Sequence, residues 1–219
     1  EWLTSEDNPL LARVMVNRVW LEHFGRGLVG SPSNFGQLGE KPTHPELLDY
    51  LAARLMEQGW SLKALHREIV LSAAYQLSSH SVEPNMTKDP GNAMVWHWAR
   101  RRLDAEPLRD TLLYVAGDLD ETVGGKPEKL SDASSRRRTV YGSVSRRKLD
   151  VTLALFDFPN PVATTEQRIQ TATPLQQLFF LNSEFIQQRA RSLAARVEAA
   201  SPDEAGRIRA AYRILFQRE

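Results

Sequence analysis

Apolar residues between Pro9 and Phe24 occupy nearly every side of a helical projection, which is typical of a buried helix. Asn8 precedes Pro9, and this pair has the pattern of an N-cap followed by proline at the first helical position. Gly25 then supplies a residue that readily adopts the left-handed conformation with which many helices end. We therefore expect one buried helix over residues 9–24.

Capping residues mark the starts of further helices. The sequences THPE at 43–46, TPLQ at 173–176 and SPDE at 201–204 match the capping box. In this motif Ser or Thr and a Glu or Gln three residues later bond each other's backbone N–H groups. Other helices are expected after a single capping side chain. The predicted caps in these helices are Thr43, Ser61, Asp104, Asp150, Thr173 and Ser201.

The sequence contains little β pattern. Residues 138–144, RTVYGSV, alternate polar residues with β-formers and predict the one strand, within a small hairpin. Residues 78–93 and 120–137 are rich in turn formers and predict long, mobile loops. Strands and helices do not alternate, which excludes a βαβ fold. We expect a mainly α fold, a single domain over residues 1–219 with about seven to eight helices and at most one small β-hairpin.

The composition is that of an ordinary globular protein, with 219 residues, 42% apolar and 25% charged. Cysteine is absent, which excludes disulfides, thiolate metal sites, a cysteine nucleophile and a C-x-x-C-H haem attachment in this segment. The net charge of +1 creates no global field that would attract nucleic acid. No apolar run approaches the length of a membrane span, so none is predicted.

Both ends of the sequence predict an internal fragment of a larger protein. The chain opens on EWLTSEDNPL without an initiator methionine, and it stops inside the helical pattern AAYRILFQRE without a cap. The start of such a fragment therefore carries no information about a signal peptide.

The segment 17–36, NRVWLEHFGRGLVGSPSNFG, gathers polar residues and glycines at the end of the first predicted helix. Its Asn17, Arg18, His23 and Asn34 are candidates for the lining of a pocket. Asn17 and Arg18 interrupt a buried helix, and burying an unpaired amide costs about 2–7 kcal/mol. The glycines match neither a P-loop nor a dinucleotide-binding fingerprint.

A structural interpretation of this segment stays open beside the functional one. Arg18 would then pair with Glu22 one helical turn later. Asn17 would bond backbone groups of the loop that follows. The whole segment would be a structural corner, in which the glycines permit unusual backbone angles.

The histidines do not predict a metal site, because none are spaced four residues apart on one helix and no H-E-x-x-H occurs. His44 lies in the first turn of a predicted helix, where the dipole disfavours its positive charge. A neutral imidazole there is a candidate catalytic base, or else a structural group. The sequence singles out neither a Ser–His–Asp arrangement nor a pair of catalytic carboxylates.

Aromatic and basic clusters provide candidate binding residues. Trp96 and Trp98 flank a histidine and form either a stacking platform for a sugar ring or a buried pair. Residues 136–148 carry six cations and no acidic residue. They suit phosphate, sulfate or an acidic polysaccharide, or else a surface balanced by nearby Asp and Glu. The arginines taken as binding candidates are Arg18, Arg101, Arg136, Arg137 and Arg138.

Seven motifs occur in a fixed order: NPLLARVMVNRVWLEHFGRGLV, PSNFGQLGEKPTHPELLDYLA, GWSLKALHREIVLSAAYQLSS, RRRLDAEPLRDTLL, RRRTVY, LFDFPNP and TPLQQLFFLNSEFI. Together they resemble the C-terminal PSD-type domain of unknown function of planctomycete cytochrome-C-domain-containing proteins, over essentially the whole chain. Tyr50 stands where the family usually has the tryptophan of HPELLDW. The resemblance establishes no catalytic residue.

The resemblance also implies a setting for the chain. In such proteins a haem c domain and a companion domain usually come first, so haem c would belong to the missing N-terminal part, with no cofactor in this segment. The setting would be extracytoplasmic, either periplasmic or secreted. The resemblance implies companion domains of the same polypeptide as partners, in a redox or polysaccharide-related neighbourhood. The basic residues add an anionic polysaccharide as a candidate partner, whereas the near-zero net charge and the exported setting argue against nucleic acid.

Two classes of function therefore remain. The first, which we favour, is a non-catalytic scaffold or binding module in a large exported multidomain protein. The alternative is a catalytic domain that acts on a carbohydrate or another anionic substrate. Its site would use the catalytic candidates His23, His44, Asn17 and Asn34 together with the arginines. Convergence of these residues on one cleft would favour the enzyme, and their dispersal would favour the binding module.

Overall fold

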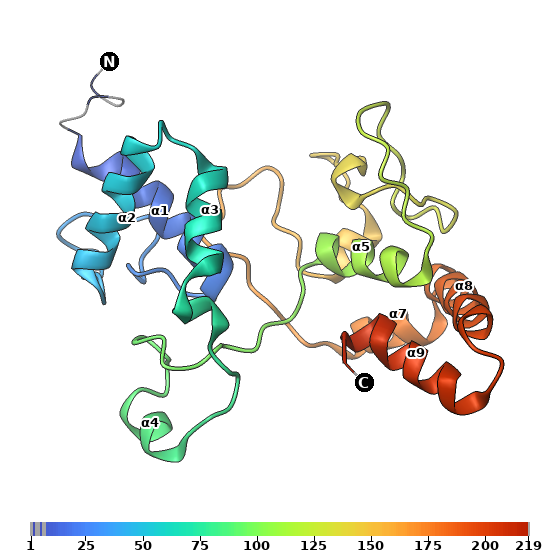
Figure 1. Cartoon of the computed structure of the whole chain (residues 1–219). Coiled ribbons are helices and arrows are strands. Elements are labelled where there is room, and N and C mark those ends of the chain that lie inside the picture. Colours follow the sequence, from blue (N-terminus) through green and yellow to red (C-terminus); the bar gives the residue numbers. More distant parts are fainter. Residues whose placement is uncertain (1, 3–4, 6–7, 219) are drawn as a thin grey trace. The chain divides into compact units, whose positions relative to one another are not determined.

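The computed structural model describes residues 2, 5 and 8–218 and contains nine α-helices within them (Figure 1). These residues form no β-strand, so the predicted mainly α fold is confirmed. The chain divides into two compact units, an N-terminal unit that ends at Arg101 and a C-terminal unit that begins at Arg102. The single domain over residues 1–219 stays a prediction.

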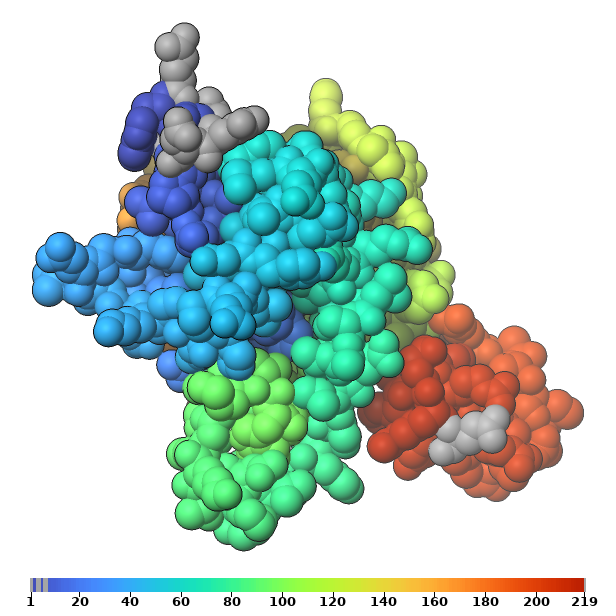
Figure 2. All heavy atoms as spheres, turned by 60° about the vertical axis from the view of Figure 1, so that its left-hand side comes forward, coloured from blue at the N-terminus to red at the C-terminus, as the bar shows by residue number. Residues whose placement is uncertain are grey.

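The N-terminal unit is built on three packed helices, with α1 against α2 and α2 against α3. Its core also takes in Leu28 and Val29 from the loop after α1. Figure 2 shows this unit as a surface, with α4 in green projecting from the other helices. The helices are α1 Pro9–Phe24, α2 Pro45–Glu57, α3 Leu62–Leu71 and α4 Glu83–Lys88, with a 3₁₀ helix at Ala73–Gln76.

Local capping fixes the ends of α1 and the start of α3 as predicted. The Asn8 side chain accepts a hydrogen bond from the backbone N–H of Leu10 at 3.0 Å. Gly25 ends α1 at a φ of 79° and donates to the Leu21 carbonyl. Ser61 accepts from the Ala64 N–H at 3.3 Å and so caps α3.

The predicted capping box at 43–46 is wrong. Helix α2 begins at Pro45, and its N-cap His44 makes no side-chain capping bond. Thr43 is tied instead to the loop after α1, because its N–H donates to the Leu28 carbonyl at 2.8 Å and its hydroxyl donates to the same oxygen at 3.3 Å. A tertiary contact has therefore replaced the local motif.

In the C-terminal unit, α5 packs against α6 and α8, and α8 packs in turn against α7 and α9. A second core forms here around Ala105, Leu130, Leu153 and Phe156. The helices are α5 Ala105–Ala116, α6 Val151–Leu155, α7 Pro174–Asn182, α8 Glu184–Ala200 and α9 Glu204–Phe216, with a 3₁₀ helix at Thr139–Tyr141.

The predicted caps of this unit are correct in two helices and shifted or replaced in two others. Thr173 forms the full capping box of α7, and Asp150 caps α6. Asp104 precedes α5 but accepts from Gln170 instead of capping the helix. The start of α9 lies later than predicted, because Asp203 accepts from the Gly206 N–H at 2.9 Å.

The strand predicted at 138–144 is wrong. This stretch contains the 3₁₀ helix, and only isolated bridges join Asp120 to Arg137 and Glu128 to Gly142. The side chain of Asp110 accepts from the Thr139 N–H at 2.7 Å, so that backbone donor is unavailable to a ladder. Of the two predicted loops, 78–93 contains helix α4 and 120–137 contains no helix.

Candidate functional site

Asn17 is fully buried in α1 and holds the loop that follows. Its side-chain Nδ2 donates to the Val29 carbonyl at 3.0 Å, and its Oδ1 accepts from the Val29 N–H at 2.8 Å. A Cβ on Gly27 would lie within 2.8 Å of the Asn17 amide and of the Val29 oxygen, so this approach requires glycine. Asn17 therefore has a structural role in this corner.

Arg18 and Asn34 do not join Asn17. Arg18 is exposed, which corrects the expectation that it faces inward, and the described residues show no ion pair between it and Glu22. The cause is helical geometry, since consecutive residues point about 100° apart around the helix. Asn34 is exposed in a turn, where its Oδ1 accepts from the Gly36 N–H at 3.0 Å.

His23 pairs with a histidine that the sequence did not single out. Its Nε2 lies 2.8 Å from Nδ1 of His66, and the ring of Tyr75 stands edge-on to it with centroids 5.5 Å apart. Burial, the charge of His66 and the charge of Arg101 all lower the pKa of His23. No spacing rule could find this pair, because α1 and α3 contribute one residue each.

The remaining candidates of the N-terminal unit serve separate contacts. Arg101 donates to the carbonyls of residues 22 and 23 at 2.7 and 3.0 Å, which satisfies the last turn of α1. The Trp96 indole donates to the Asp89 carbonyl at 3.1 Å. Trp98 packs on Tyr75, with ring centroids 4.7 Å apart, and His44 contacts the Thr43 hydroxyl.

The arginines at 136–138 have three different environments. Arg136 lies 3.9 Å from Asp118, and Arg138 lies 3.8 Å from Asp110. Arg137 covers the ring of Tyr141 and donates to three backbone carbonyls, those of residues 122, 124 and 126. Arg137 therefore folds the 120–137 loop around its own guanidinium.

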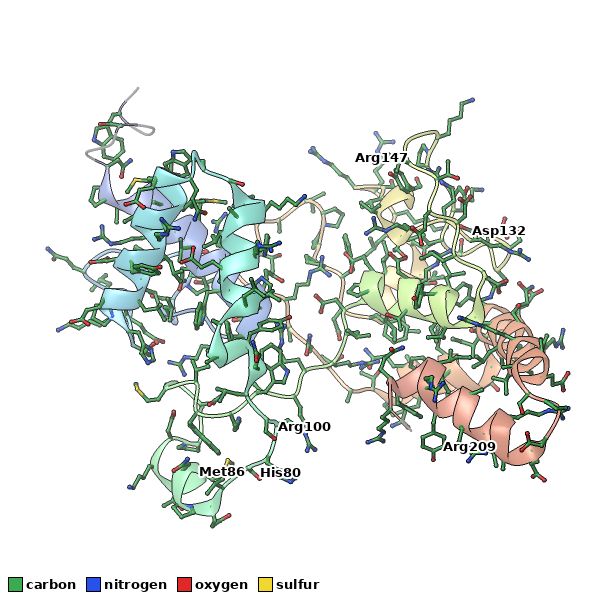
Figure 3. The ribbon with its side chains drawn as sticks, viewed as in Figure 1. His80, Met86, Arg100, Asp132, Arg147 and Arg209 are labelled. Carbon is green, nitrogen blue, oxygen red and sulfur yellow. The ribbon has the colours of Figure 1, made fainter. Side chains whose placement is uncertain are left out.

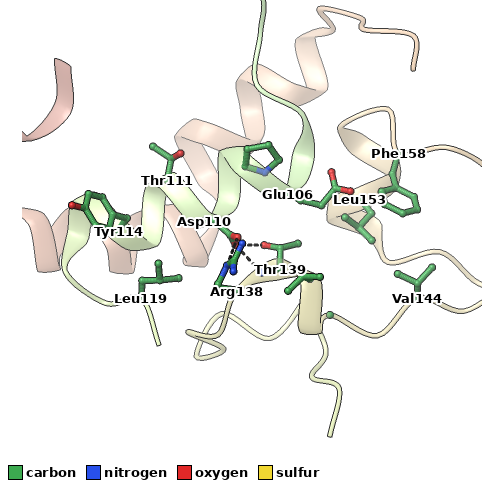
Figure 4. A pocket seen from close by; sticks show the side chains of 13 residues that line it. Glu106, Asp110, Thr111, Tyr114, Leu119, Arg138, Thr139, Val144, Leu153 and Phe158 are labelled. Carbon is green, nitrogen blue, oxygen red and sulfur yellow. Dashed lines mark hydrogen bonds and ion pairs between the residues drawn. The ribbon is translucent and has the colours of Figure 1, made fainter. Parts of the chain in front are cut away.

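A groove of about 660 Å³ runs along one side of α5, and we call it the α5 groove (Figure 4). Polar groups reach it from Glu106, Asp110 and Tyr114 on the helix and from Arg138 on the facing segment. Its volume lies within the range of small-molecule sites. Apolar side chains form most of its walls, including Leu119, Val140, Val144, Leu153 and Phe158.

Arg109 and Asp110, at the centre of α5, hold in place the segment that faces the helix across the groove. Arg109 is buried and donates to the carbonyls of Ser135 and Arg137 at 2.8 and 2.9 Å. Asp110 accepts from the N–H and the hydroxyl of Thr139 at 2.7 and 2.6 Å. These bonds join the LRD sequence at 108–110 to the RRRTVY motif, which explains why the groove forms here.

Glu106, in the first turn of α5, lines the groove and accepts two hydrogen bonds from Arg168. The Nη1 and Nη2 atoms of Arg168 lie 2.7 and 2.8 Å from the two carboxylate oxygens. Burial is the largest single influence and raises the pKa of Glu106, but the hydrogen bonds from Arg168, a backbone hydrogen bond and the charge of Arg168 together outweigh it, and the pKa is lowered. The carboxylate is therefore ionised at neutral pH, which does not suit a general acid.

A second, more polar pocket of about 450 Å³ lies over the 120–137 loop, near the label of Asp132 in Figure 3. Its three carboxylates are matched by three cations, among them Arg136 and Arg137. The charges of Arg136 and Arg137 are therefore locally compensated. The charged residues that line it are Asp120, Glu128, Lys129, Asp132, Arg136 and Arg137.

The sequence candidates are thus divided among several places. Arg138 lines the α5 groove and Arg136 and Arg137 line the polar pocket, whereas the other candidates belong to the N-terminal unit. Sequence reasoning missed Glu106, Asp110 and Tyr114. Their spacing of four residues on one helix is the signal that could have identified them.

No haem attachment exists in this segment, because the chain has no cysteine. In the part of the chain that the structure describes, no three His, Asp or Glu side chains come together as ligands of one metal ion. Within the same residues, no helix is both long and apolar enough to cross a membrane.

The family model described as PSD1, protein of unknown function (DUF1553), matches residues 1–219. No curated protein and no solved structure matches the chain. Since the family model covers its full length, the chain belongs to the PSD1 family of proteins of unknown function.

Proposed function

We propose that this chain is a non-catalytic binding module and that the α5 groove is its ligand site. The observation that carries the proposal is the state of the groove's ionisable groups. Glu106 is paired with Arg168, and Asp110 is bonded to Thr139 with Arg138 close by. A catalytic acid or base needs a pKa near the working pH, whereas the pKa of Glu106 is shifted away from neutrality.

The setting of this module is part of the proposal. The seven ordered motifs support a place in a large exported protein in which a haem c domain precedes this one. The partners would be companion domains of the same polypeptide, in an extracytoplasmic compartment. This setting rests on the resemblance of the motifs alone.

A catalytic domain acting on a carbohydrate is the second candidate. It is favoured by two carboxylates, Glu106 and Asp110, that face one groove from successive turns of α5. Their structural partners and the lowered pKa of Glu106 argue against it. Among the earlier candidates, Asn17 and Asn34 are occupied by backbone contacts. We therefore place the binding module first.

Blocking the groove tests the proposal. Val140 lines the groove and is 70% exposed, so Val140→Glu should fill it with a charge without disturbing the core. Val123→Glu is the matched control, because Val123 is 86% exposed in the same unit and lies outside the groove. Ligands are first identified by native mass spectrometry. We expect Val140→Glu to abolish their binding and Val123→Glu to leave it intact. We also expect the ligand to be recovered from the unmodified chain chemically unchanged. Binding that survives Val140→Glu, or turnover of the ligand, would contradict the proposal.

A further inference from the structure

Resting on the proposed function, we infer that the α5 groove takes a neutral oligosaccharide. The inference depends on the balance of charge in the groove, on which hydrogen-bonding atoms remain open, and on where the aromatic rings lie. Each of these is a property of the described residues around α5.

Each carboxylate that lines the groove has a guanidinium beside it. Arg168 neutralises Glu106 through two hydrogen bonds, and the guanidinium of Arg138 lies 3.8 Å from the carboxylate of Asp110. An anionic ligand would meet two carboxylates, and a cationic ligand would find each carboxylate already beside a guanidinium, so either would lose hydration without a dedicated counter-ion. The groove therefore suits an uncharged ligand better than the anionic polysaccharide expected from the basic segment.

Two groups at the centre of the groove remain open to a ligand. Both hydrogen bonds from Thr139 go to Oδ1 of Asp110. Oδ2 lies 3.8 Å from Arg138 Nε, which is beyond hydrogen-bond distance, so it can accept a further bond. The Arg138 side chain is 56% exposed and keeps donors available.

Hydroxyl groups match this acceptor and donor together. A hydroxyl both donates and accepts, whereas an ammonium only donates and a carboxylate only accepts. Neighbouring hydroxyls of a sugar ring can donate to Asp110 Oδ2 and accept from Arg138 at the same time. A neutral polyhydroxylated ligand is the class that satisfies both atoms without adding charge.

Aromatic rings lie toward the two ends of the groove. Figure 4 shows Tyr114 at one end and Phe158 at the other, with Asp110 between them. Tyr114 is 59% exposed and lies one turn of α5, about 6 Å, beyond Asp110. Both rings offer an apolar face that suits the C–H face of a sugar, and Tyr114 adds a phenolic hydroxyl that can bond its hydroxyls. The volume of about 660 Å³ admits more than a single ring.

An apolar peptide is the competing ligand, since the aliphatic walls would also accept its side chains. Its backbone donors and acceptors are spaced along an extended chain, whereas Asp110 Oδ2 and Arg138 lie side by side. We therefore favour the oligosaccharide, and the peptide becomes an outcome of the test.

The test measures affinities of the whole chain by isothermal titration calorimetry. The probes are neutral hexasaccharides of glucose, mannose and galactose, a sulfated hexasaccharide and an apolar decapeptide. Tyr114→Ala removes the exposed ring at one end of the groove. Tyr50→Ala is the matched control, because Tyr50 is a similarly exposed tyrosine in the N-terminal unit.

We expect a neutral hexasaccharide to bind with an affinity that does not change between low and high ionic strength. Tyr114→Ala should lower this affinity about tenfold, and Tyr50→Ala should leave it unchanged. Tighter, salt-dependent binding of the sulfated probe would overturn the inference. Binding of the peptide alone, if Val140→Glu abolishes it, would also overturn the inference but leave the binding module standing. Binding of no probe would overturn the inference, and the separate ligand screen with Val140→Glu would then decide the proposed function.

Discussion

Buried polar side chains set the course of the loops in both units. Asn17 bonds both backbone groups of Val29, and Arg109 bonds the carbonyls of Ser135 and Arg137. Neither residue has a hydrogen bond to a carboxylate among the described residues. Asn17 bonds the backbone of Val29, and Arg109 donates to the hydroxyls of Ser135 and Thr139 as well as to the two carbonyls. Removing such a side chain leaves buried peptide groups without a hydrogen-bond partner, and this lowers the stability by more than the bond itself contributes.

The first prediction concerns Asn17. Asn17→Ala should lower the free energy of unfolding by about 1–3 kcal/mol, because the N–H and carbonyl of Val29 lose their partner. Asn34→Ala is the control, since Asn34 is exposed, and it should change the stability by less than about 0.5 kcal/mol. Urea unfolding followed by circular dichroism measures both. Equal losses for the two variants would show that Asn17 does not hold the corner.

The second prediction concerns acid stability. The pKa of Glu106 is lower in the folded chain than its ordinary value, so the unfolded chain takes up the proton first as the pH falls. The stabilisation is therefore complete above about pH 4.5, near the ordinary pKa of glutamate, and is lost as the pH falls through the folded-state pKa. Glu106→Gln should flatten the stability profile between pH 5 and about pH 3. A profile identical to that of the exposed-site variant Glu46→Gln would contradict the pairing with Arg168.

The residue that caps a helix depends on whether tertiary contacts leave the local capping side chain available. The box at Thr173 forms as written in the sequence, and the one at 43–46 is lost because Thr43 bonds Leu28. At α9 the cap moves to Asp203, and Ser201 donates to that carboxylate at 2.7 Å. Capping motifs therefore locate helices reliably here, but they do not always identify the capping side chain.

The third prediction separates the two candidates for the α9 cap. Asp203→Ala should cost about 1 kcal/mol, the usual effect of losing an N-cap. Ser201→Ala should cost less, because Ser201 acts only through Asp203. Thermal melts of the two variants provide the comparison. A larger loss from Ser201→Ala would restore the cap predicted from the sequence.

The sequence contained enough to predict the helical fold, because helix caps and apolar spacing are local properties. The sequence of residues 138–144 did not show that the predicted strand would be absent. Residues 138–144 have β-forming side chains, but the N–H of Thr139 is taken by Asp110, which lies 29 residues earlier. Competition of this kind depends on the folded arrangement and not on the segment itself.

The candidate site was predictable only in part, for the same reason. Arg138 was named from its cluster, and it lines the α5 groove. Glu106 and Asp110 were not named, although they share one face of a helix that was predicted. The pairing of His23 with His66 also joins two helices, so no short motif encodes it.

At the scale of the whole molecule, the two units have separate cores and separate contents. The N-terminal unit holds the corner at Asn17 and the His23–His66 pair, and the C-terminal unit holds the α5 groove. Membership of the PSD1 family applies to both units, since the match spans residues 1–219. Our proposal assigns ligand binding to the C-terminal unit.

The most direct test of this assignment is an NMR chemical-shift map of the isotope-labelled chain, recorded with the tightest binding ligand before and after prolonged incubation. We predict shift changes concentrated at Tyr114, Val140 and Val144, which line the groove, and a ligand that remains chemically intact. Shift changes centred on His23 and His66, or conversion of the ligand into product, would contradict the account.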